Sequence, residues 1–518
     1  MLIAGAGVAG LEAALALRAL AGDLVDLEVL SPADRFTYKP MLVAEPFGNG
    51  ADTGLDLAPI LAEADAHHRR GALAGVETDN RIAITDAGDR VGYEALLVAL
   101  GARALDAIPG ALSFSGAPER ARFEDMLAAL GRSGTKRLAF VVPPHATWSI
   151  AAYELALLTA AERDARRIEG VEITLVTHEP SPLGRFGATA SQLVAAKLEE
   201  AAVMLRVSCA ADRVDGEELI LASGEALGFD RVVALPRLEV PPLPGLPQRE
   251  HGFLATDGQM QVEGLDDVWA AGDATALPIK QGGLAAQEAD IAASAIAARA
   301  GADVELEPFR PMLRAALITG DTPEFMQAPV GDPDAGMASV GSAGWASRMK
   351  LSASHLGPYL ARALGGSATD EAALRREAIS LQGGAEVHSR VVGTLLRAAD
   401  SDAGSGNYRD ALGWLDVVEQ LNLVVPTDYV VRRDDWRREL DPKLASSPAA
   451  DRIDARFATT AAAISDLSRR IGWLREIEAR TGGEMESHLD DLERDIQDVI
   501  ALSRKTGTLK RGRKGSSG

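Results

Sequence analysis

The sequence contains a single cysteine and no long apolar run. Because Cys209 stands alone, the chain cannot make an internal disulfide, a CxxC redox pair or a zinc site of thiolates. No uncharged apolar stretch reaches the ~18–20 residues that a membrane-spanning helix needs. Met1 is followed at once by apolar residues with no basic stretch, so we expect no secretory signal and predict a cytoplasmic protein.

The charge balance also excludes some classes of partner. Lys and Arg total 53 against 75 Asp and Glu, a formal net charge of −22 at pH 7, which argues against a nucleic-acid partner. No histidine spacing is typical of metal ligands, and we expect no metal site. With 518 residues, 47% of them hydrophobic, the chain has an ordinary globular composition and room for about three domains.

The first thirty residues carry a glycine-rich turn between a strand and a helix. An apolar strand at 2–4 precedes a GxGxxG motif, an apolar-faced helix follows it, and a second strand is expected at 27–30. This context is typical of a dinucleotide site, in which backbone N–H groups at the helix start bind a pyrophosphate. Ser31, at the end of the second strand, is expected to bond a ribose hydroxyl. The motif residues are Gly5, Ala6, Gly7, Val8, Ala9 and Gly10.

A second motif lies far downstream, where an apolar strand at 268–271 ends in Gly272-Asp273. A run at 278–284 and an alanine-rich helix from about 285 to 300 follow it, and 96–102 is another strand that ends in a glycine, Gly101. Taken together over residues 1–300, these motifs resemble the FAD-dependent pyridine nucleotide–disulfide oxidoreductase superfamily. The resemblance implies an α/β protein with two Rossmann-like domains of the glutathione-reductase-like FAD/NAD(P)-binding fold.

The resemblance also implies roles for individual residues. Asp273 would accept hydrogen bonds from the flavin's ribityl chain, and Ala285 and Gln287 would open a helix aimed at the pyrimidine edge of the flavin. Lys280 and Pro40 would lie at the reacting face as catalytic candidates. The remaining expected FAD contacts are Lys39, Gly101, Gly272 and Gly283.

Residues 35–42 indicate the branch of the superfamily. They are similar to the aromatic–x–Pro–Leu segment of sulfide:quinone reductases and type II NADH:quinone reductases, and they lack the cysteine pair of the disulfide reductases. This favours a small redox substrate, with a quinone as a candidate acceptor. Cys209 falls in an expected strand at 205–209 and is interpreted as a buried packing residue.

The segment between 138 and 161 bears on NAD(P)H. A strand at 138–142 and a helix from Tyr153 flank the turn 143–149, which has two prolines and no glycine. Proline has no N–H to offer a pyrophosphate, so the turn argues against NAD(P)H as a cofactor. Glu154, however, stands where the superfamily's nucleotide domain has a glutamate, and NAD(P)H stays open as an alternative.

Beyond residue 300 we expect a flavin cap and then an all-α C-terminal extension. Residues 345–362 lack acidic groups, which fits an interfacial helix on the inner face of a membrane or, alternatively, a helix packed over the flavin domain. Apolar a/d-like spacing at 464–474 and 489–499 predicts a coiled-coil hairpin that packs on itself, dimerises or binds a protein partner through 368–518.

We predict an FAD-binding domain at 1–107 and 236–300, a second Rossmann-like domain at 108–235, a flavin cap at 301–366, the helical extension at 367–504 and a disordered basic tail at 505–518.

Three functions are compatible with these patterns. The first is an FAD-dependent oxidoreductase that passes two electrons from a donor through flavin to an acceptor. The second is an NAD(P)H dehydrogenase like the type II NADH:quinone reductases. The third is a non-catalytic flavin-binding scaffold that acts through its helical C-terminus.

Overall fold

The structure is a computed structural model whose residues divide into two compact units, Met1–Leu374 and Arg375–Gly518. It describes residues 1–39, 42–48, 54–115, 117–130, 136–320, 323–331, 337–340, 350–363, 390–420 and 486–506, and single residues at 429, 432, 433, 435, 436, 439, 467 and 471. Pro40 and the predicted domain boundary at 366/367 lie outside these residues.

The first domain is built on a five-stranded parallel sheet of order β20-β9-β1-β2-β5. Alternate side chains point to its two faces, as the strand repeat requires. Ile3 and its register partners Val29 and Leu97 are buried against helices, whereas Leu2 and Leu30 are buried against an antiparallel sheet. The strands are β1 (Leu2–Ala4), β2 (Leu27–Ser31), β5 (Ala66–Arg70), β9 (Leu96–Val98) and β20 (Val268–Ala270).

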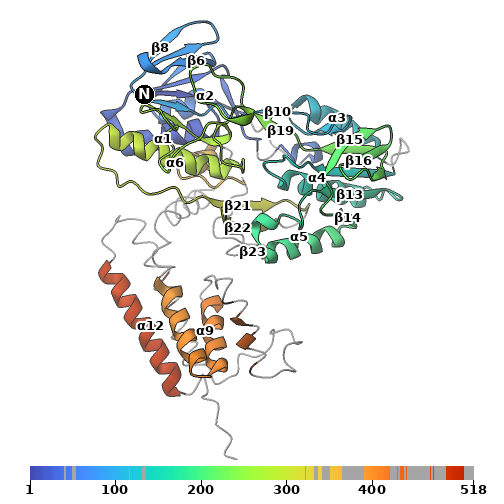
Figure 1. Ribbon diagram of the computed structural model, residues 1–518, viewed down its shortest axis with the longest axis vertical. Coiled ribbons are helices and arrows are strands. Elements are labelled where there is room, and N and C mark those ends of the chain that lie inside the picture. The colour runs from blue at the N-terminus through green and yellow to red at the C-terminus, as the bar shows by residue number, and fades with distance from the viewer. Residues whose placement is uncertain are drawn as a thin grey trace, which may run out of the picture. The chain divides into compact units, whose positions relative to one another are not determined.

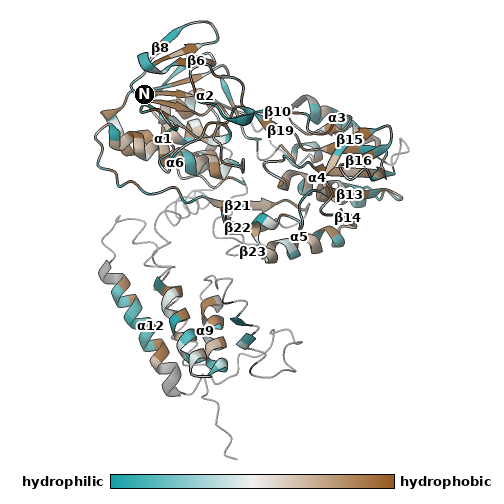
Figure 2. Cartoon of the chain, in the orientation of Figure 1, coloured by the Kyte–Doolittle hydropathy of each residue, from teal (hydrophilic) through white to brown (hydrophobic). Residues whose placement is uncertain are grey.

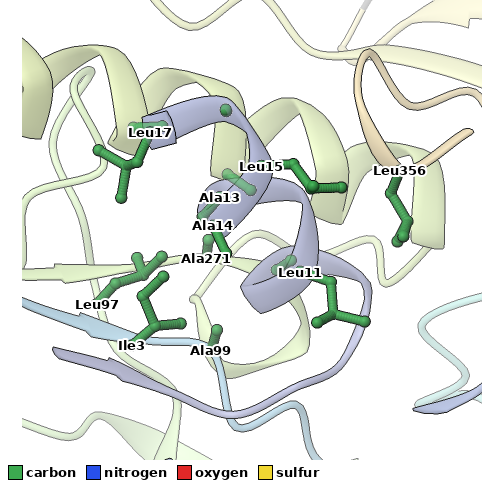
Figure 3. Close-up of a cluster of buried hydrophobic side chains, with 14 of the residues drawn as sticks. Ile3, Leu11, Ala13, Ala14, Leu15, Leu17, Leu97, Ala99, Ala271 and Leu356 are labelled. Carbon is green, nitrogen blue, oxygen red and sulfur yellow. The ribbon is translucent and has the colours of Figure 1, made fainter. Parts of the chain in front are cut away.

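Two helices cover one face of this sheet. α1 (Val8–Ala21) and α6 (Gly282–Arg299) pack side by side, and α2 (Leu57–Glu63) joins their core (Figure 1). Figure 3 shows Leu11, Ala14 and Leu17 of α1 over Ile3 and Leu97 of the sheet. The other face is covered by β6 (Leu73–Glu77), β7 (Ile82–Thr85) and β8 (Arg90–Gly92).

The second domain repeats this plan. Its parallel sheet has the order β11-β18-β12-β13-β14, with helices on one face and the small antiparallel sheet β15-β16-β17 on the other. The main strands are β11 (Leu112–Ser113), β12 (Arg137–Val142), β13 (Glu172–Thr177), β14 (Val203–Arg206) and β18 (Arg231–Ala234). The helices are α3 (Ala117–Ala129), α4 (Ile150–Ala165) and α5 (Ala188–Glu200); the small sheet is β15 (Ala211–Asp215), β16 (Glu218–Leu221) and β17 (Ala226–Gly228).

Shorter elements complete the first unit. β3 (Arg35–Thr37) pairs with β4 (Gly54–Asp56), β10 (Arg103–Leu105) pairs with β19 (Arg237–Glu239), and β21 (Met312–Leu317), β22 (Glu324–Pro329) and β23 (Met337–Val340) form an antiparallel sheet. Cys209 lies beyond the end of β14 and is half-buried, so its placement in a strand and its full burial are wrong, but it does pack against a core cluster of the second domain.

The segment expected to form an interfacial helix is described from residue 350 onward. Only α7 (Leu356–Ala363) is helical there. Leu356 and Leu360 of α7, and Leu351 before it, are buried in the core that also contains residues of α1 and α6. The described part of this segment therefore fits the alternative expectation, a helix packed on the first domain, and membrane contact stays a prediction. Among the described helices, none has the length and hydropathy that a membrane crossing requires.

The second unit is helical where it is described. Residues 390–404, α9 (Tyr408–Gln420) and α12 (Glu486–Thr506) share one core that includes Leu395, Trp414 and Leu492. α12 has both hydrophilic and hydrophobic residues (Figure 2), and its apolar residues 489, 492, 496 and 499 point into this core. Leu467 and Ile471 of the earlier a/d-like run are buried there too.

The two predicted Rossmann-like domains and the helical C-terminal region are thus confirmed. The turn of the predicted hairpin, between the runs at 464–474 and 489–499, lies outside the described residues, and so does the predicted tail beyond Thr506.

Candidate cofactor and redox site

A cavity of ≈ 300 Å³ lies where the first domain, the second domain and β21 meet. Parallel strands bring their carboxyl-terminal loops to one edge, and the loops after β1, β9 and β20 all reach this cavity. The predicted site residues that line it are Gly7, Val8, Ala9, Lys39, Gly101, Gly272, Asp273, Lys280 and Ala285.

The turn between β1 and α1 forms an open cradle at the cavity. A Cβ on Gly5 would lie 2.2 Å from the Ala99 carbonyl oxygen, and one on Gly10 would lie 1.9 Å from the Gly5 oxygen. Gly7 differs, because among the described residues nothing lies within 4 Å of such an atom. No described side chain caps the start of α1, so its N-terminal N–H groups offer a site for an anion.

The Gly272-Asp273 turn closes against this cradle. Gly272 has a φ of +80°, and a Cβ there would lie 3.1 Å from the Cβ of Ala9 on α1. The two glycine motifs, far apart in the sequence, therefore border one cavity. Burial raises the pKa of the half-buried Asp273, while the positive charges of Lys39 and Lys280 act in the opposite direction.

A buried network lies behind the turn. The Gly272 N–H donates to Glu288 Oε2 at 2.5 Å, and the Thr275 hydroxyl lies 2.9 Å from Glu288 Oε1. Lys280 is 6% exposed; its ammonium donates to the Thr275 carbonyl oxygen and lies 4.6 Å from the centre of the Phe253 ring. Burial raises the pKa of Glu288 to about 7 and lowers that of Lys280, whose charge Glu288 and Asp273 favour.

The start of α6 differs from the expectation. The helix begins at Gly282 and not near Ala285, because Gln281 caps it by accepting the Leu284 N–H. Ala285 still lines the cavity, but Gln287 does not. The Gln287 side chain bonds the backbone N–H and carbonyl of Met312, so it joins α6 to β21.

The remaining predicted residues lie around the cavity without lining it. Gly5, Ala6 and Gly10 form the turn behind it, and Gly283 is buried at the start of α6. Ser31 is buried at the end of β2, where its hydroxyl contacts the backbone of Ala33.

Sequence reasoning missed an ion pair in the cavity wall. Glu154 on α4 is fully buried, and both its oxygens accept from the Lys350 ammonium, at 2.6 and 2.7 Å. Burial raises the pKa of Glu154, whereas Lys350 and the Ile318 N–H oppose that rise. The family match at Glu154 was the available signal; no local pattern pairs it with a lysine 196 positions later.

The glycine-free turn after β12 fills the second domain's side of the cavity. Trp148 lines the wall and packs edge-on against Phe186, with ring centres 6.0 Å apart. Glu179, just after β13, is buried and accepts from the hydroxyls of Tyr153 at 2.7 Å and Thr177 at 2.9 Å. The Glu179 carboxylate at the end of β13 thus has its hydrogen-bond donors within the protein.

Three potential metal ligands meet outside the cavity. Atoms of Glu12, Asp290 and His355 lie within 4.8 Å of one another. Glu12 already accepts the backbone N–H groups of His355 at 2.8 Å and Leu356 at 2.6 Å, and Asp290 accepts the Ser354 hydroxyl. The carboxyl groups of Glu12 and Asp290 thus anchor residues 354–356 by hydrogen bonds.

Comparison with known proteins defines the class of this chain. A family model described as pyridine nucleotide-disulphide oxidoreductase matches residues 1–300, and the chain belongs to this family. Membership of this family identifies the chain as an FAD-dependent oxidoreductase whose substrates are unspecified. The predicted superfamily is thus confirmed. No curated protein matches the chain by sequence.

Solved structures share the fold. The sulfide:quinone oxidoreductase of the hyperthermophilic bacterium Aquifex aeolicus is similar with a TM-score of 0.60 and 19% identity, over 66% of this chain and 86% of that one. A NAD-dependent persulfide reductase from A. fulgidus is similar with a TM-score of 0.49 and 17% identity, over 63% of each chain. At 19% identity the likeness to the Aquifex protein concerns the fold alone.

The residues present fit FAD. The open space at Gly7 and the uncapped start of α1 suit a pyrophosphate, and the Asp273 carboxylate suits the hydroxyls of a ribityl chain. Lys39 and Lys280 supply positive charge at the same cavity.

Proposed function

We propose that this oxidoreductase passes two electrons from a donor through FAD to a quinone-like acceptor. The observation that carries the proposal is that Gly7 and Asp273 border the same cavity as the Glu154–Lys350 pair. FAD would supply the chemistry by accepting and releasing the electrons. The similar Aquifex protein is named for a quinone acceptor, which supports this choice.

The protein's own residues would bind, orient and supply protons. The start of α1 would bind the phosphates, and Asp273 would orient the cofactor by accepting hydrogen bonds. Val43, Trp148 and Ile150 give the cavity an apolar wall that excludes water and suits a planar ring. The Glu154–Lys350 pair would hold a proton beside an acceptor that gains negative charge.

The test is an anaerobic titration of the purified, flavin-bound protein. We expect a yellow protein whose flavin is reduced by a suitable donor and reoxidised by a soluble quinone. E154Q should slow quinone reoxidation by roughly 10²-fold, because general acid–base groups contribute about that much, while its flavin content stays unchanged. A matched change on an exposed acid, E263Q, should leave the rate unchanged. A colourless protein that refuses added FAD contradicts the proposal.

NADH dehydrogenation is the second candidate. The Rossmann-like shape of the second domain favours it, and the turn at 143–149 opposes it because Trp148 stands in the cavity wall. The same titration decides between them: if NADH bleaches the flavin within turnover time, NADH is the donor. If sulfide or another small reductant bleaches it and NADH does not, the donor reaches the cavity directly.

A further inference from the structure

Glu288 is a buried carboxyl directly behind the proposed FAD site. It is 2% exposed and does not line the cavity, but it accepts the backbone N–H of Gly272, whose turn does. Its hydrogen bond reaches the site through the Gly272-Asp273 turn, and its charge reaches the site through Lys280.

The bonding around Glu288 accommodates an added proton. The Thr275 hydroxyl lies 2.9 Å from Glu288 Oε1 and 3.0 Å from the Gly272 carbonyl oxygen, and it can donate its one proton to either. When Glu288 is ionised, Thr275 donates to the carboxylate. When Glu288 is protonated, the carboxyl donates to Thr275, which then donates to Gly272. Both protonation states are satisfied without movement of a heavy atom.

The charges around Glu288 couple it to the cavity. Lys280 stabilises its ionised form, Asp273 opposes that form, and Lys39 faces Asp273 across the turn. Glu12 of α1 interacts with Asp290, which lies two residues after Glu288 on α6. The Glu154–Lys350 pair lies at the cavity on the side of α4. Burial brings the pKa of Glu288 to about 7, within the working range of most proteins.

We propose that Glu288 is a positioning residue that takes up a proton when the cofactor site gains negative charge and releases it when that charge leaves. The proposal rests on the proposed function, since the added charge comes from two-electron reduction of bound FAD. Two-electron reduction would bring two electrons and at least one proton to bound FAD. Negative charge that this proton does not neutralise raises the proton affinity of Glu288. The carboxylate then takes one further proton from a hydronium ion in the solvent: an O–H bond of that ion breaks, water is left, and an O–H bond to Glu288 forms.

The test is the midpoint potential of the bound flavin between pH 5.5 and 9, measured by equilibration with a reference dye. We expect the wild-type plot of potential against pH to contain a break near neutral pH that corresponds to one additional proton per two electrons. E288Q, which keeps the size and hydrogen-bonding atoms of the side chain, should lose this break while retaining flavin. The exposed control E263Q should keep it.

A second variant keeps the proposal falsifiable if E288Q fails to fold. T275V removes the hydroxyl that stabilises the ionised carboxyl, so its break should move to higher pH. An unchanged plot in E288Q, or an unmoved break in T275V, overturns the proposal while the proposed function stands. A wild-type protein that holds no flavin overturns both.

Discussion

The buried carboxyls show how single residues set the pH response of this fold. Glu12 and Asp290 approach each other between α1 and α6, and burial raises the pKa of both. Their mutual repulsion is relieved when one of them is protonated. The anchoring of the segment before α7 therefore depends on protonation as well as on hydrogen bonds.

Asp290→Asn tests this reading at the residue scale. The pKa of Asp290 is about 6 in the folded state against ~3.9 for an unfolded aspartate, so its contribution to stability is fully present below pH ~3.9 and is lost as pH rises through 6. D290N should be more stable than wild type at pH 8, by up to ~3 kcal/mol, and close to it at pH 4. Urea unfolding at both pH values measures the difference. A constant difference across this range contradicts the assignment.

At the scale of the element, two glycines of the β1–α1 unit differ in what a side chain at their position would meet. Gly10 is needed for packing, because a Cβ there meets the Gly5 carbonyl oxygen, whereas Gly7 faces open space. The same GxGxxG motif thus contains one position that the fold requires and one that, in our proposal, the cofactor requires.

The paired variants G10A and G7A test this separation. G10A should lower the free energy of unfolding of the apoprotein by ~1–3 kcal/mol or more, as overpacking does. G7A should change apoprotein stability by about 1 kcal/mol at most, because a Cβ there meets nothing although alanine is a poorer N-cap than glycine, yet it should weaken FAD binding. Denaturant unfolding and flavin retention on dialysis measure the two effects. Equal loss of stability in both variants contradicts the cradle.

At the scale of the whole molecule, the two units have separate cores. The core of the second unit contains described residues from Val391 onward, while the hydrophobic clusters of the first unit end at Leu360. The residues that line the cavity all belong to the first unit. We therefore expect the proposed electron transfer to depend on the first unit.

Deletion of residues 375–518 separates catalysis from a scaffold role. The truncated chain should fold, keep FAD and reoxidise with quinone at the wild-type rate, because the cavity and its supporting core remain. Far-UV circular dichroism, flavin content and quinone reoxidation test this. If the full chain turns over no donor–acceptor pair and captures a partner only through 375–518, the chain is a scaffold and the oxidoreductase proposal is wrong.

Local patterns in the sequence determined much of this protein. The apolar strand, glycine turn and helix at 2–21 follow from short-range steric and hydrogen-bonding needs, and so do the strand and turn at 268–273. The start of α6 was misplaced by three residues because its cap is a glutamine, Gln281, bonded on its other side to β21.

Only the tertiary structure decided which distant residues meet. Glu154 and Lys350, Glu288 and the Gly272 turn, and Glu12 and Asp290 are brought together by the packing of domains and helices. Sequence periodicity reports burial but not partners, because the pairing of two buried charges depends on the relative placement of elements that the chain leaves far apart.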